Sequence, residues 1–562
     1  MSEIMSRYCP RIKFDSYEDF KENYICNEPE SFNFAYDVVD EWAKIDSEKP
    51  ALVWTNDLAE MKRYTFADIK ALSDRAANVI ASFGIKKGDV VMLILKQRPE
   101  VWVCMTALMK LGAICIPASY QLTPKDIVYR CNIANVKMLI SVDEEEVVRH
   151  IGIARPECET LQTLISVGTA VPEGFISFES EMQKADAVFA CPAGNEAVVN
   201  TDPMLIYFSS GTTGMPKMVW HDFAFPLGHI VTAKYWQCVQ DYRVHMTQTD
   251  SGWAKFAWGK IFGQWICGAA IGAYDTEKFV PHKLLEALMR IQPTTFCAPA
   301  TIYRYLIKED LSGYDLSFIE HASLAGEPLN PEVFRKIEEL TGLTVHEGFG
   351  QTESSVLLAN FPWVDIKPGS MGKPSPLYNI DLIDTDGSSC EDGVVGSIVV
   401  KDTDKKHPLG LFHGYWQDLQ TTLKSWRDGI YNTGDMAWRD ADGYFWFVGR
   451  NDDVIKCSGY RIGPFEVESV LIEHPSVLEC AVTAAPDPVR GQVVKATIVL
   501  AKGYEPSDAL VKELQNHVKK TTAPYKYPRI VEFVAALPKT TSDKIQRNVI
   551  RQRDSEKNNQ DS

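Results

Sequence analysis

Short apolar runs alternate with stretches of helical periodicity through the first three quarters of this 562-residue chain. Residues 51–56, 90–96 and 136–142 have the length and apolar character of buried strands. Residues 65–84 open with Thr-x-x-Asp and stop at a glycine, as a capped helix does, and residues 99–111 keep helical spacing. This alternation predicts an α/β fold with parallel-type sheets covered by helices, in which ligands bind at the carboxyl ends of the strands.

The predicted secondary-structure pattern changes near Asp452. Before it lies a β-rich region with Asp-Gly turns, and after it we expect a small α+β domain with helices at 464–474 and 507–520. We therefore predict a large N-terminal domain of several subdomains over 1–451 and a small C-terminal domain over 452–562. The polar end of the chain, from Asp554 onward, is expected to be frayed.

Composition excludes some classes of function. The chain has 58 Lys and Arg against 75 Asp and Glu, a net charge of −17, which argues against a nucleic-acid partner. Thirteen cysteines without a C-x-x-C pair predict reduced thiols. The N-terminus lacks an apolar or Arg-rich targeting pattern, and the longest apolar stretches are shorter than the ~20 residues of a membrane span. These features predict a cytoplasmic protein, and they leave open whether it assembles with copies of itself.

A Gly- and hydroxyl-rich loop follows the strand-like run that ends at Phe208. Glycines, four hydroxyl side chains and a lysine suit a loop that wraps polyphosphate. It is not a Walker A loop, because Pro216 precedes the lysine and Met218 follows it. The alternative is an ordinary surface turn. The loop consists of Ser209, Ser210, Gly211, Thr212, Thr213, Gly214, Met215, Pro216 and Lys217.

Further motifs identify a family resemblance. EGFGQTES at 347–354, YNTGD at 431–435, the stretch 449–468 and PKTTSDKIQR at 538–547 follow the phosphate loop in order. Together they resemble the adenylate-forming superfamily of acyl-CoA synthetases, carrier-protein adenylation domains and luciferases, and 252–270 with 521–534 look most like the medium-chain acyl-CoA synthetase branch. The resemblance implies a ligase that turns ATP, a carboxylic acid and coenzyme A into acyl-CoA, AMP and diphosphate through an acyl-adenylate.

The resemblance also implies an ATP site. Thr212 and Thr213 would donate hydroxyls to the phosphates, with Thr212 catalytic, and Mg²⁺ would lie near Thr212 and Glu353. Asp435 would accept from the ribose hydroxyls and Arg450 would donate there. The alternatives are a helix-start carboxylate for Glu353, a turn residue for Asp435 and an interdomain salt bridge for Arg450. The adenine slot would comprise Gly326, Glu327 and Pro328 on one wall and Glu347, Gly348, Phe349, Gly350, Gln351 and Thr352 on the other, with Phe349 stacked on the base.

Lys544 is the main catalytic candidate that the resemblance implies. It would stabilise charge that develops only in the adenylation transition state. The family commonly has glycine before this lysine, whereas this chain has Asp543, which predicts weaker adenylation.

The second step would use a rotation of the C-terminal domain about Asp452. Ser458, Gly459 and Tyr460 would then line a pantetheine tunnel. The residues that would meet the phosphates of coenzyme A are Arg461, Arg490 and Lys519, although Lys519 also fits a solvated charge.

The acyl pocket would involve Trp253, Lys255 and Trp258, with Trp258 shortening it in favour of short, branched or medium chains. The alternative is that these aromatic side chains are core. Lys255 could extend to solvent, pair with a carboxylate or line the pocket. Three rival functions remain at this point: an enzyme that loads a carrier protein, a luciferase-like oxygenase, and a catalytically weak nucleotide-binding protein.

Overall fold

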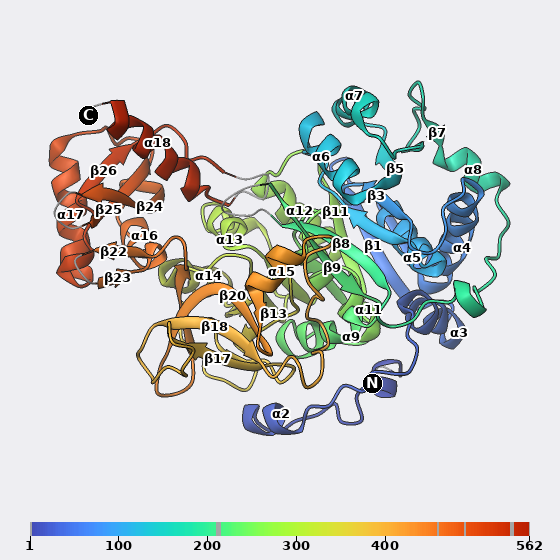
Figure 1. The fold of residues 1–562 in the computed structure, drawn as a ribbon, viewed down its shortest axis with the longest axis horizontal. Helices are drawn as coiled ribbons and strands as arrows, with labels where there is room; N and C mark the ends of the chain where they lie inside the picture. Colours follow the sequence, from blue (N-terminus) through green and yellow to red (C-terminus); the bar gives the residue numbers. More distant parts are fainter. Residues whose placement is uncertain (1–2, 210–214, 458–459, 488–490, 540–543, 561–562) are drawn as a thin grey trace.

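The chain folds into two lobes in the computed structural model (Figure 1). The structure describes residues 3–209, 215–457, 460–487, 491–539 and 544–560. The large lobe holds two mainly parallel sheets with helices around them and a β-rich region, and the small lobe at the left of Figure 1 holds the last strands and helices. This is the α/β architecture that the alternating sequence pattern predicts.

One sheet of the large lobe leads into the phosphate loop. In the described residues its strands run in the order β7-β6-β5-β3-β4-β8-β9, parallel except for β9. Its strands are β3 (Val90–Ile94), β4 (Ile114–Pro117), β5 (Val136–Val142), β6 (Thr163–Val167), β7 (Ile176–Ser177), β8 (Pro203–Ser209) and β9 (Lys217–Asp222). The neighbouring helices are α4 (Phe66–Ser82), α5 (Glu100–Leu111), α6 (Pro124–Ala134), α7 (Glu145–Ala154) and α8 (Phe178–Lys184). The loop thus leaves the carboxyl end of β8 and re-enters the sheet in β9.

The second sheet carries two of the predicted ATP-site segments at the ends of its strands. Residues 326–328 follow β13, and the motif 347–354 begins in β14. Its order is β16-β15-β14-β13-β12-β10-β11-β1-β2, parallel from β14 to β1. Its strands are β1 (Pro50–Asn56), β2 (Met61–Thr65), β10 (Val244–Thr247), β11 (Ala270–Asp275), β12 (Thr295–Ala298), β13 (His321–Ala325), β14 (Val345–Phe349), β15 (Leu358–Ala359) and β16 (Lys373–Pro374). Its helices are α9 (Phe225–Ile230), the π-helix η4 (Val231–Trp236), α10 (Lys255–Gly259), α11 (Phe262–Ile266), α12 (Pro281–Ile291), α13 (Ala300–Leu306) and α14 (Pro331–Thr341).

A smaller antiparallel sheet and the small lobe complete the chain. The sheet comprises β17 (Asn379–Ile383), β18 (Gly396–Lys401), β19 (Trp426–Arg427), β20 (Ile430–Arg439) and β21 (Phe445–Arg450), with α15 (Leu419–Ser425) beside it. The small lobe comprises β22 (Ile455–Cys457), β23 (Tyr460–Ile462), β24 (Val477–Asp487), β25 (Gly491–Leu500), β26 (Ile530–Phe533), α16 (Pro464–Ile472), α17 (Asp508–Thr521) and α18 (Arg547–Gln560). Its main apolar cluster draws only on its own residues. The domain boundary at Asp452 stays a prediction.

Several local expectations are confirmed and one is wrong. Thr65 caps α4 with a reciprocal capping box, and Gly84 has φ +83° just past the helix end. All thirteen cysteines are free thiols. The expectation of a frayed end is wrong at Asp554, which is buried in α18 and pairs with Lys495 Nζ at 2.5 Å.

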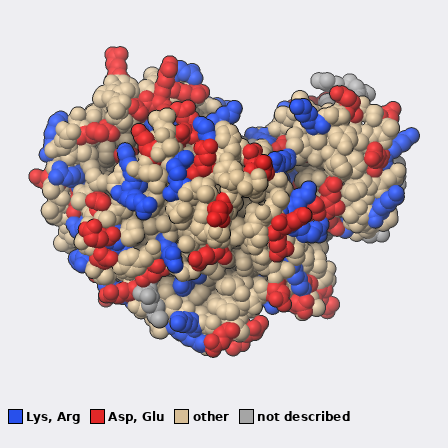
Figure 2. Space-filling view, turned by 180° about the vertical axis from the view of Figure 1, so that it is seen from behind, with Lys and Arg blue, Asp and Glu red and all other residues tan. Residues whose placement is uncertain are grey.

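The length and apolar character of the described helices bear on whether this chain could span a membrane. No helix within the described ranges is long and apolar enough to cross a bilayer. Figure 2 shows basic and acidic side chains interspersed across both lobes on the face it presents.

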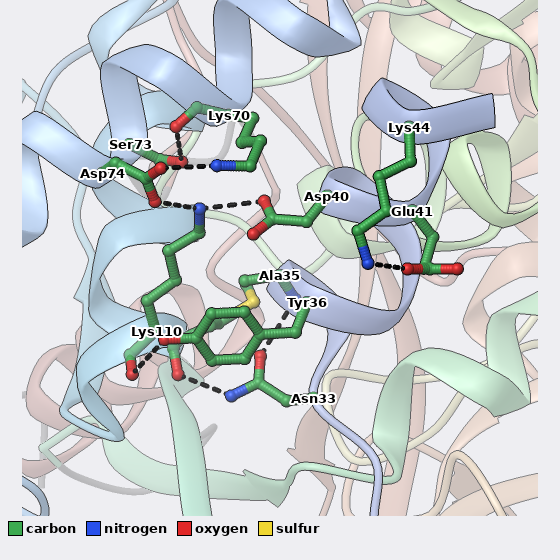
Figure 3. Close-up of polar contacts among 11 residues, drawn as sticks. Asn33, Ala35, Tyr36, Asp40, Glu41, Lys44, Lys70, Ser73, Asp74 and Lys110 are labelled. Carbon is green, nitrogen blue, oxygen red and sulfur yellow. Dashed lines mark hydrogen bonds and ion pairs between the residues drawn. The ribbon is translucent and has the colours of Figure 1, made fainter. Parts of the chain in front are cut away.

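A buried ion cluster ties the first helices to the large lobe (Figure 3). Lys110 on α5 is fully buried, and its Nζ lies 2.8 Å from an oxygen of Asp40 and 2.5 Å from one of Asp74. Asp40 ends the π-helix η1 (Ala35–Asp40), which precedes α3 (Glu41–Ile45), and Asp74 lies on α4 and also pairs with Lys70. One cation thus compensates two buried carboxylates from separate segments.

Lys110→Met is expected to lower the free energy of unfolding by about 3–5 kcal/mol, since it leaves carboxylates buried without their cation. Burial raises the pKa of Asp40, so this group takes up a proton readily when Lys110 is gone. The loss should therefore be smaller at pH 5 than at pH 8. Urea unfolding followed by tryptophan fluorescence measures it, and Lys184→Met, which breaks an exposed pair with Glu181, is the control expected to cost under about 1 kcal/mol. Equal stability of the two variants would contradict this account.

Candidate functional site

The segment after β14 forms one wall of the candidate site against two tryptophans. A β-carbon on Gly348 would lie 2.5 Å from the ring of Trp236, and one on Gly350 would lie 2.3 Å from the ring of Trp258. Both positions therefore need glycine, since β-carbons this close would collide with the rings. Trp258 is buried, and its indole N–H donates to the carbonyl of Ser354 at 2.9 Å. The proposed adenine segment and the proposed acyl-pocket tryptophan are thus in direct contact.

Asp435 is a strand residue, so its interpretation as a turn residue is wrong. It lies in β20, directly opposite Arg450 in β21, and is almost completely buried. The amide of Gln351 donates to Asp435 Oδ2 at 2.5 Å, and Arg450 lies 3.4 Å from Oδ1. Burial raises the pKa of Asp435 to about 6, against the opposing attraction of Arg450. A buried carboxylate oriented by two donors is suited to accept further hydrogen bonds from a ligand.

Arg450 pairs with Asp435 of its own sheet and lies close to a second carboxylate just beyond the sheet. Besides Asp435, its guanidinium lies 3.9 Å from Asp452, the predicted hinge residue. Asp452 is the first residue of the predicted C-terminal domain, so this pair agrees with the interdomain salt bridge that the sequence left open. Arg450 is the last residue of β21, and Asp452 follows it two positions later.

Two glutamates, the buried Glu347 and the half-buried Glu327, hold the segment that follows β13. Glu347 accepts from the N–H of Leu329 at 3.2 Å, and burial raises its pKa to about 8. Glu327 accepts from the N–H and hydroxyl of Thr301 and pairs with Arg304 at 3.2 Å. Burial would raise the pKa of Glu327, but Arg304 and Thr301 outweigh it and the pKa lies below its usual value. The carboxylates of both glutamates thus bind groups of the protein itself.

Lys544 of the small lobe lies near the charged residues of the candidate site. The residue as a whole is exposed, while its ammonium interacts electrostatically with Glu327, Asp435 and Glu353, and Arg450 repels it. Neighbouring protein atoms displace water from the ammonium and lower the pKa of Lys544, and the carboxylates oppose that shift. One lysine of the small lobe therefore lies among the charged groups that the large lobe presents.

Lys255 is the first residue of α10 and contacts the end of β13. Its ammonium donates to the carbonyl of Ala325, at the end of β13, and would lie 3.0 Å from a β-carbon on Gly326. The pKa of Lys255 is lowered to about 8, chiefly by burial; Lys544 acts in the same direction, and Glu327 opposes the shift. The described hydrogen bond of Lys255 goes to a backbone carbonyl and not to a carboxylate, so it does not support the alternative in which Lys255 pairs with a carboxylate. The half-buried Trp253 precedes it by two residues.

Glu353 occurs in a turn after β14, so its interpretation as a helix-start carboxylate is wrong. Its carbonyl accepts from the N–H of Phe412 at 2.8 Å, and its Oε1 accepts from the hydroxyl of Tyr415 at 2.9 Å. Its other oxygen has no hydrogen-bond partner within the described part of the chain. A carboxylate held through one oxygen and open at the other fits a hard cation such as Mg²⁺.

Several predicted residues lie outside the described part of the chain. At the edges of the phosphate loop, the Tyr129 hydroxyl donates to the carbonyl of Pro216 at 3.0 Å, and Lys217 Nζ lies 4.9 Å from the centre of the Tyr415 ring. Lys519 is half-buried with its Nζ 4.0 Å from the centre of the Tyr527 ring, so it is more than a solvated charge. The residues outside the described ranges are Ser210, Gly211, Thr212, Thr213, Gly214, Ser458, Gly459, Arg490 and Asp543, together with the side chains of Tyr460 and Arg461.

Sequence reasoning missed residues whose partners are distant in the chain. Tyr415 contacts Glu353 across 62 positions, and Tyr431 donates to Gln351 Oε1 at 2.6 Å across 80 positions. No local pattern marks either pair. A signal was present only in the HGYW and YNTGD stretches that contain the two tyrosines.

Comparisons with known proteins agree with this arrangement. The family model described as AMP-binding enzyme matches residues 39–416, and the model of the AMP-binding enzyme C-terminal domain matches 466–544. The chain is 40% identical to the mitochondrial acyl-coenzyme A synthetase ACSM3 of Mus musculus over 550 residues, 96% of this chain and 94% of that protein. It is 42% identical to the mitochondrial acyl-coenzyme A synthetase ACSM4 of Homo sapiens over 546 residues, 95% of this chain and 93% of that protein.

Solved structures give the same result for the fold. The anthranilate CoA ligase AuaEII in complex with anthranoyl-AMP superposes with a TM-score of 0.86 at 28% identity, covering 95% of this chain and 99% of that one. A benzoate CoA ligase from Burkholderia xenovorans superposes with a TM-score of 0.80 at 25% identity, covering 92% of this chain and all of that one. The resemblance predicted from the motifs is therefore confirmed, and the chain belongs to the AMP-binding enzyme family of adenylate-forming enzymes.

Proposed function

We propose that this protein is an AMP-forming acyl-CoA synthetase that converts a carboxylic acid, ATP and coenzyme A into acyl-CoA, AMP and diphosphate. The observation that best supports the proposal is the position of Lys544, which extends from the small lobe toward Asp435 and Glu327 of the large lobe. The family membership and the similarity to acyl-coenzyme A synthetases over nearly the whole chain support the same reaction.

In the first step an oxygen of the acid attacks the α-phosphorus of ATP. The bond from this phosphorus to the bridging oxygen breaks, and diphosphate leaves with the electron pair. Asp435 would hold the two ribose hydroxyls and Arg450 would donate beside it. Lys544 would stabilise the charge that develops at the α-phosphate and the acyl oxygen, which favours the transition state over the bound substrates.

Mg²⁺ would be held by the open oxygen of Glu353 and the hydroxyl of Thr212. Bound there, it supplies positive charge that neutralises the triphosphate. The hydroxyl of Tyr415 and the N–H of Phe412 hold the side chain and the backbone of Glu353.

In the second step the sulfur of coenzyme A attacks the carbonyl carbon of the acyl-adenylate. A thioester bond forms, AMP leaves with the electron pair of the broken carbon–oxygen bond, and the thiol proton passes to solvent. Rotation about Asp452 would withdraw Lys544 and bring Ser458, Gly459 and Tyr460 to the pantetheine. Arg461, Arg490 and Lys519 would bind the phosphates of coenzyme A.

Two linked assays test the proposal. ATP–diphosphate exchange is measured with a panel of linear, branched and aromatic carboxylic acids, and consumption of free thiol is then measured after coenzyme A is added. Acid-dependent exchange followed by thiol loss is expected. Exchange without thiol loss would instead indicate an enzyme that loads a carrier protein, and no exchange with any acid would indicate a nucleotide-binding protein.

Trp258 is proposed as the floor of the acyl pocket. Its ring faces Trp236 edge-on at 6.0 Å between centres and lies 6.3 Å from the ring of the fully buried His229. Trp258→Gly would open space toward these two residues and is expected to shift the preferred acid to a longer chain by several methylenes. The kcat/KM ratios over a chain-length series measure the shift. An unchanged profile in a folded variant would dismiss the floor assignment.

Asp543 is proposed to weaken adenylation, because it replaces the glycine that commonly precedes the catalytic lysine of the family. Asp543→Gly should raise the rate of ATP–diphosphate exchange by about 3- to 10-fold, since it removes a negative charge beside the phosphates. Asp543→Asn serves as the control, because it removes the charge without restoring glycine. An unchanged or lower exchange rate in both variants would contradict this prediction.

The cytoplasmic location predicted from the sequence is not supported by the comparisons. The names of the similar acyl-coenzyme A synthetases assign those proteins to mitochondria. We propose a mitochondrial location as the alternative, which fractionation of cells expressing the chain would test.

A further inference from the structure

One buried tyrosine connects two parts of the proposed ATP site. Tyr415 pairs with Val219 of β9 in an isolated antiparallel bridge, and the next residue, Trp416, donates its N–H to the carbonyl of Met218 at 2.7 Å. The same chain segment pairs with the turn after β14, where Leu411 bridges Ser354. The segment 411–416 therefore joins the strand that leaves the phosphate loop to the turn that carries Glu353.

The side chain of Tyr415 contacts one charged residue from each of these two parts: its hydroxyl contacts Glu353 and its ring contacts Lys217. Its hydroxyl donates to Glu353 Oε1 at 2.9 Å, and the centre of its ring lies 4.9 Å from Lys217 Nζ. The hydroxyl of Tyr415 is thus the donor that occupies this oxygen of Glu353.

The position of this side chain is itself fixed by packing. Only 7% of Tyr415 is exposed, and its ring packs edge-on against Phe412 at 5.2 Å between centres. Its backbone N–H donates to the hydroxyl of Thr422 at 2.9 Å, at α15. A rigid support of this kind suits a residue that orients a neighbour rather than one that reacts.

We propose that Tyr415 is a positioning residue for adenylation. Its hydroxyl occupies one oxygen of Glu353 and directs the other toward the metal–triphosphate, while its ring holds Lys217 at the end of the phosphate loop. This inference rests on the proposed function, since it assigns Tyr415 to the first half-reaction of that enzyme. The thioester-forming step uses neither the metal–triphosphate nor Lys217, so this step should be unaffected when Tyr415 is replaced.

Tyr415→Phe removes the hydroxyl and keeps the ring. This variant should bind Mn²⁺ about 10-fold more weakly in the presence of α,β-methylene-ATP. The electron paramagnetic resonance signal of free Mn²⁺ measures this binding. Exchange of diphosphate into ATP should need about 10-fold more Mg²⁺ for half-saturation. Thioester formation from synthetic acyl-adenylate and coenzyme A should match the wild-type rate.

Tyr303→Phe is the matched control. Tyr303 is also buried, and its hydroxyl donates to the carbonyl of Ser323 at 3.0 Å in a different apolar cluster. Mn²⁺ binding and Mg²⁺ dependence should be unchanged in this variant. Tyr415→Leu additionally removes the ring beneath Lys217, and it should weaken binding of the ATP analogue further than Tyr415→Phe does.

Three outcomes decide the proposal. Weaker Mn²⁺ binding with an intact thioester step supports it. Unchanged Mn²⁺ binding in Tyr415→Phe, or an equal fall in both half-reactions, overturns it and leaves Tyr415 a purely structural residue. If the wild-type protein shows no exchange with any acid, the proposed function fails, while the Mn²⁺ measurement still decides the role of Tyr415.

Discussion

Replacing Lys544 with alanine is expected to lower the rate of acyl-adenylate formation by about 10²- to 10³-fold, the effect of removing one preorganised charge from a transition state. The lysine extends from the small lobe toward Asp435, Glu327 and Glu353, where phosphate charge would develop. Because the second step would take place with this lysine withdrawn, thioester formation from supplied acyl-adenylate should stay within roughly two-fold of wild type. Single-turnover measurement of each half-reaction separates the two effects.

Lys512→Ala is the control for this prediction. Lys512 is an exposed lysine on α17 of the same lobe, so its removal changes the charge of the lobe equally without touching the cleft. Both half-reactions should be unaffected in it. If Lys544→Ala lowered both half-reactions equally, or neither, the assignment of Lys544 to adenylation would be wrong.

Asp435→Asn is expected to raise the KM for ATP by about 10- to 100-fold, because a charged acceptor for the ribose hydroxyls becomes a neutral one. The wild-type KM should also depend on pH. Burial raises the pKa of Asp435 to about 6, so the carboxylate takes up a proton as the pH falls through 6 and the KM for ATP rises. The variant should lose this dependence, which initial rates between pH 5 and 8 would measure.

The same substitution should stabilise the ligand-free protein. The pKa of Asp435 is higher in the folded chain than its ordinary value of 3.8, so keeping the group ionised costs folding free energy above about pH 6 and costs nothing below about pH 4. At pH 7.5 Asp435→Asn should therefore raise the free energy of unfolding, on the order of 1–2 kcal/mol. Lower stability together with lower affinity would indicate damage to the fold instead.

Asp275→Asn is the matched control for both measurements. Asp275 is buried, its pKa is raised by burial, and it pairs with Arg98 at 3.0 Å at the end of β11. Like Asp435, it is a buried carboxylate beside an arginine, but no ligand is proposed for it. Its replacement should change stability without changing the KM for ATP.

Local interactions explain which elements the sequence could predict. The start of α4 was predictable because Thr65 and Asp68 cap each other within one turn. The helices and strands of the large sheets follow from apolar periodicity, which is likewise a property of neighbouring residues. The prediction of a frayed end was wrong at Asp554 because the ion pair of this residue is with Lys495, which lies 59 positions away on strand β25.

The candidate site shows the same limit. The motifs predicted that the glycine-rich segment, Asp435 and Lys544 belong to one site, because their order and spacing resemble a known family. The motifs did not predict that the carboxylate of Glu347 would accept a hydrogen bond from the N–H of Leu329. They also did not predict that Asp435 would lie in a strand and accept a hydrogen bond from Gln351. Such contacts arise from tertiary packing between segments, and a pattern read along the chain does not contain them.

Movement of the small lobe is the central claim of this account, and a distance measurement tests it most directly. Spin labels on introduced ketone side chains at Leu58, an exposed residue of the large lobe, and Lys512 of the small lobe would report the separation of the lobes by pulsed electron resonance. With a non-hydrolysable acyl-adenylate analogue, one distribution matching the present arrangement is expected. Adding coenzyme A should shift the population to a second, distinct distance. A single distribution that does not change with coenzyme A, in a labelled protein that still makes acyl-CoA, would contradict the account.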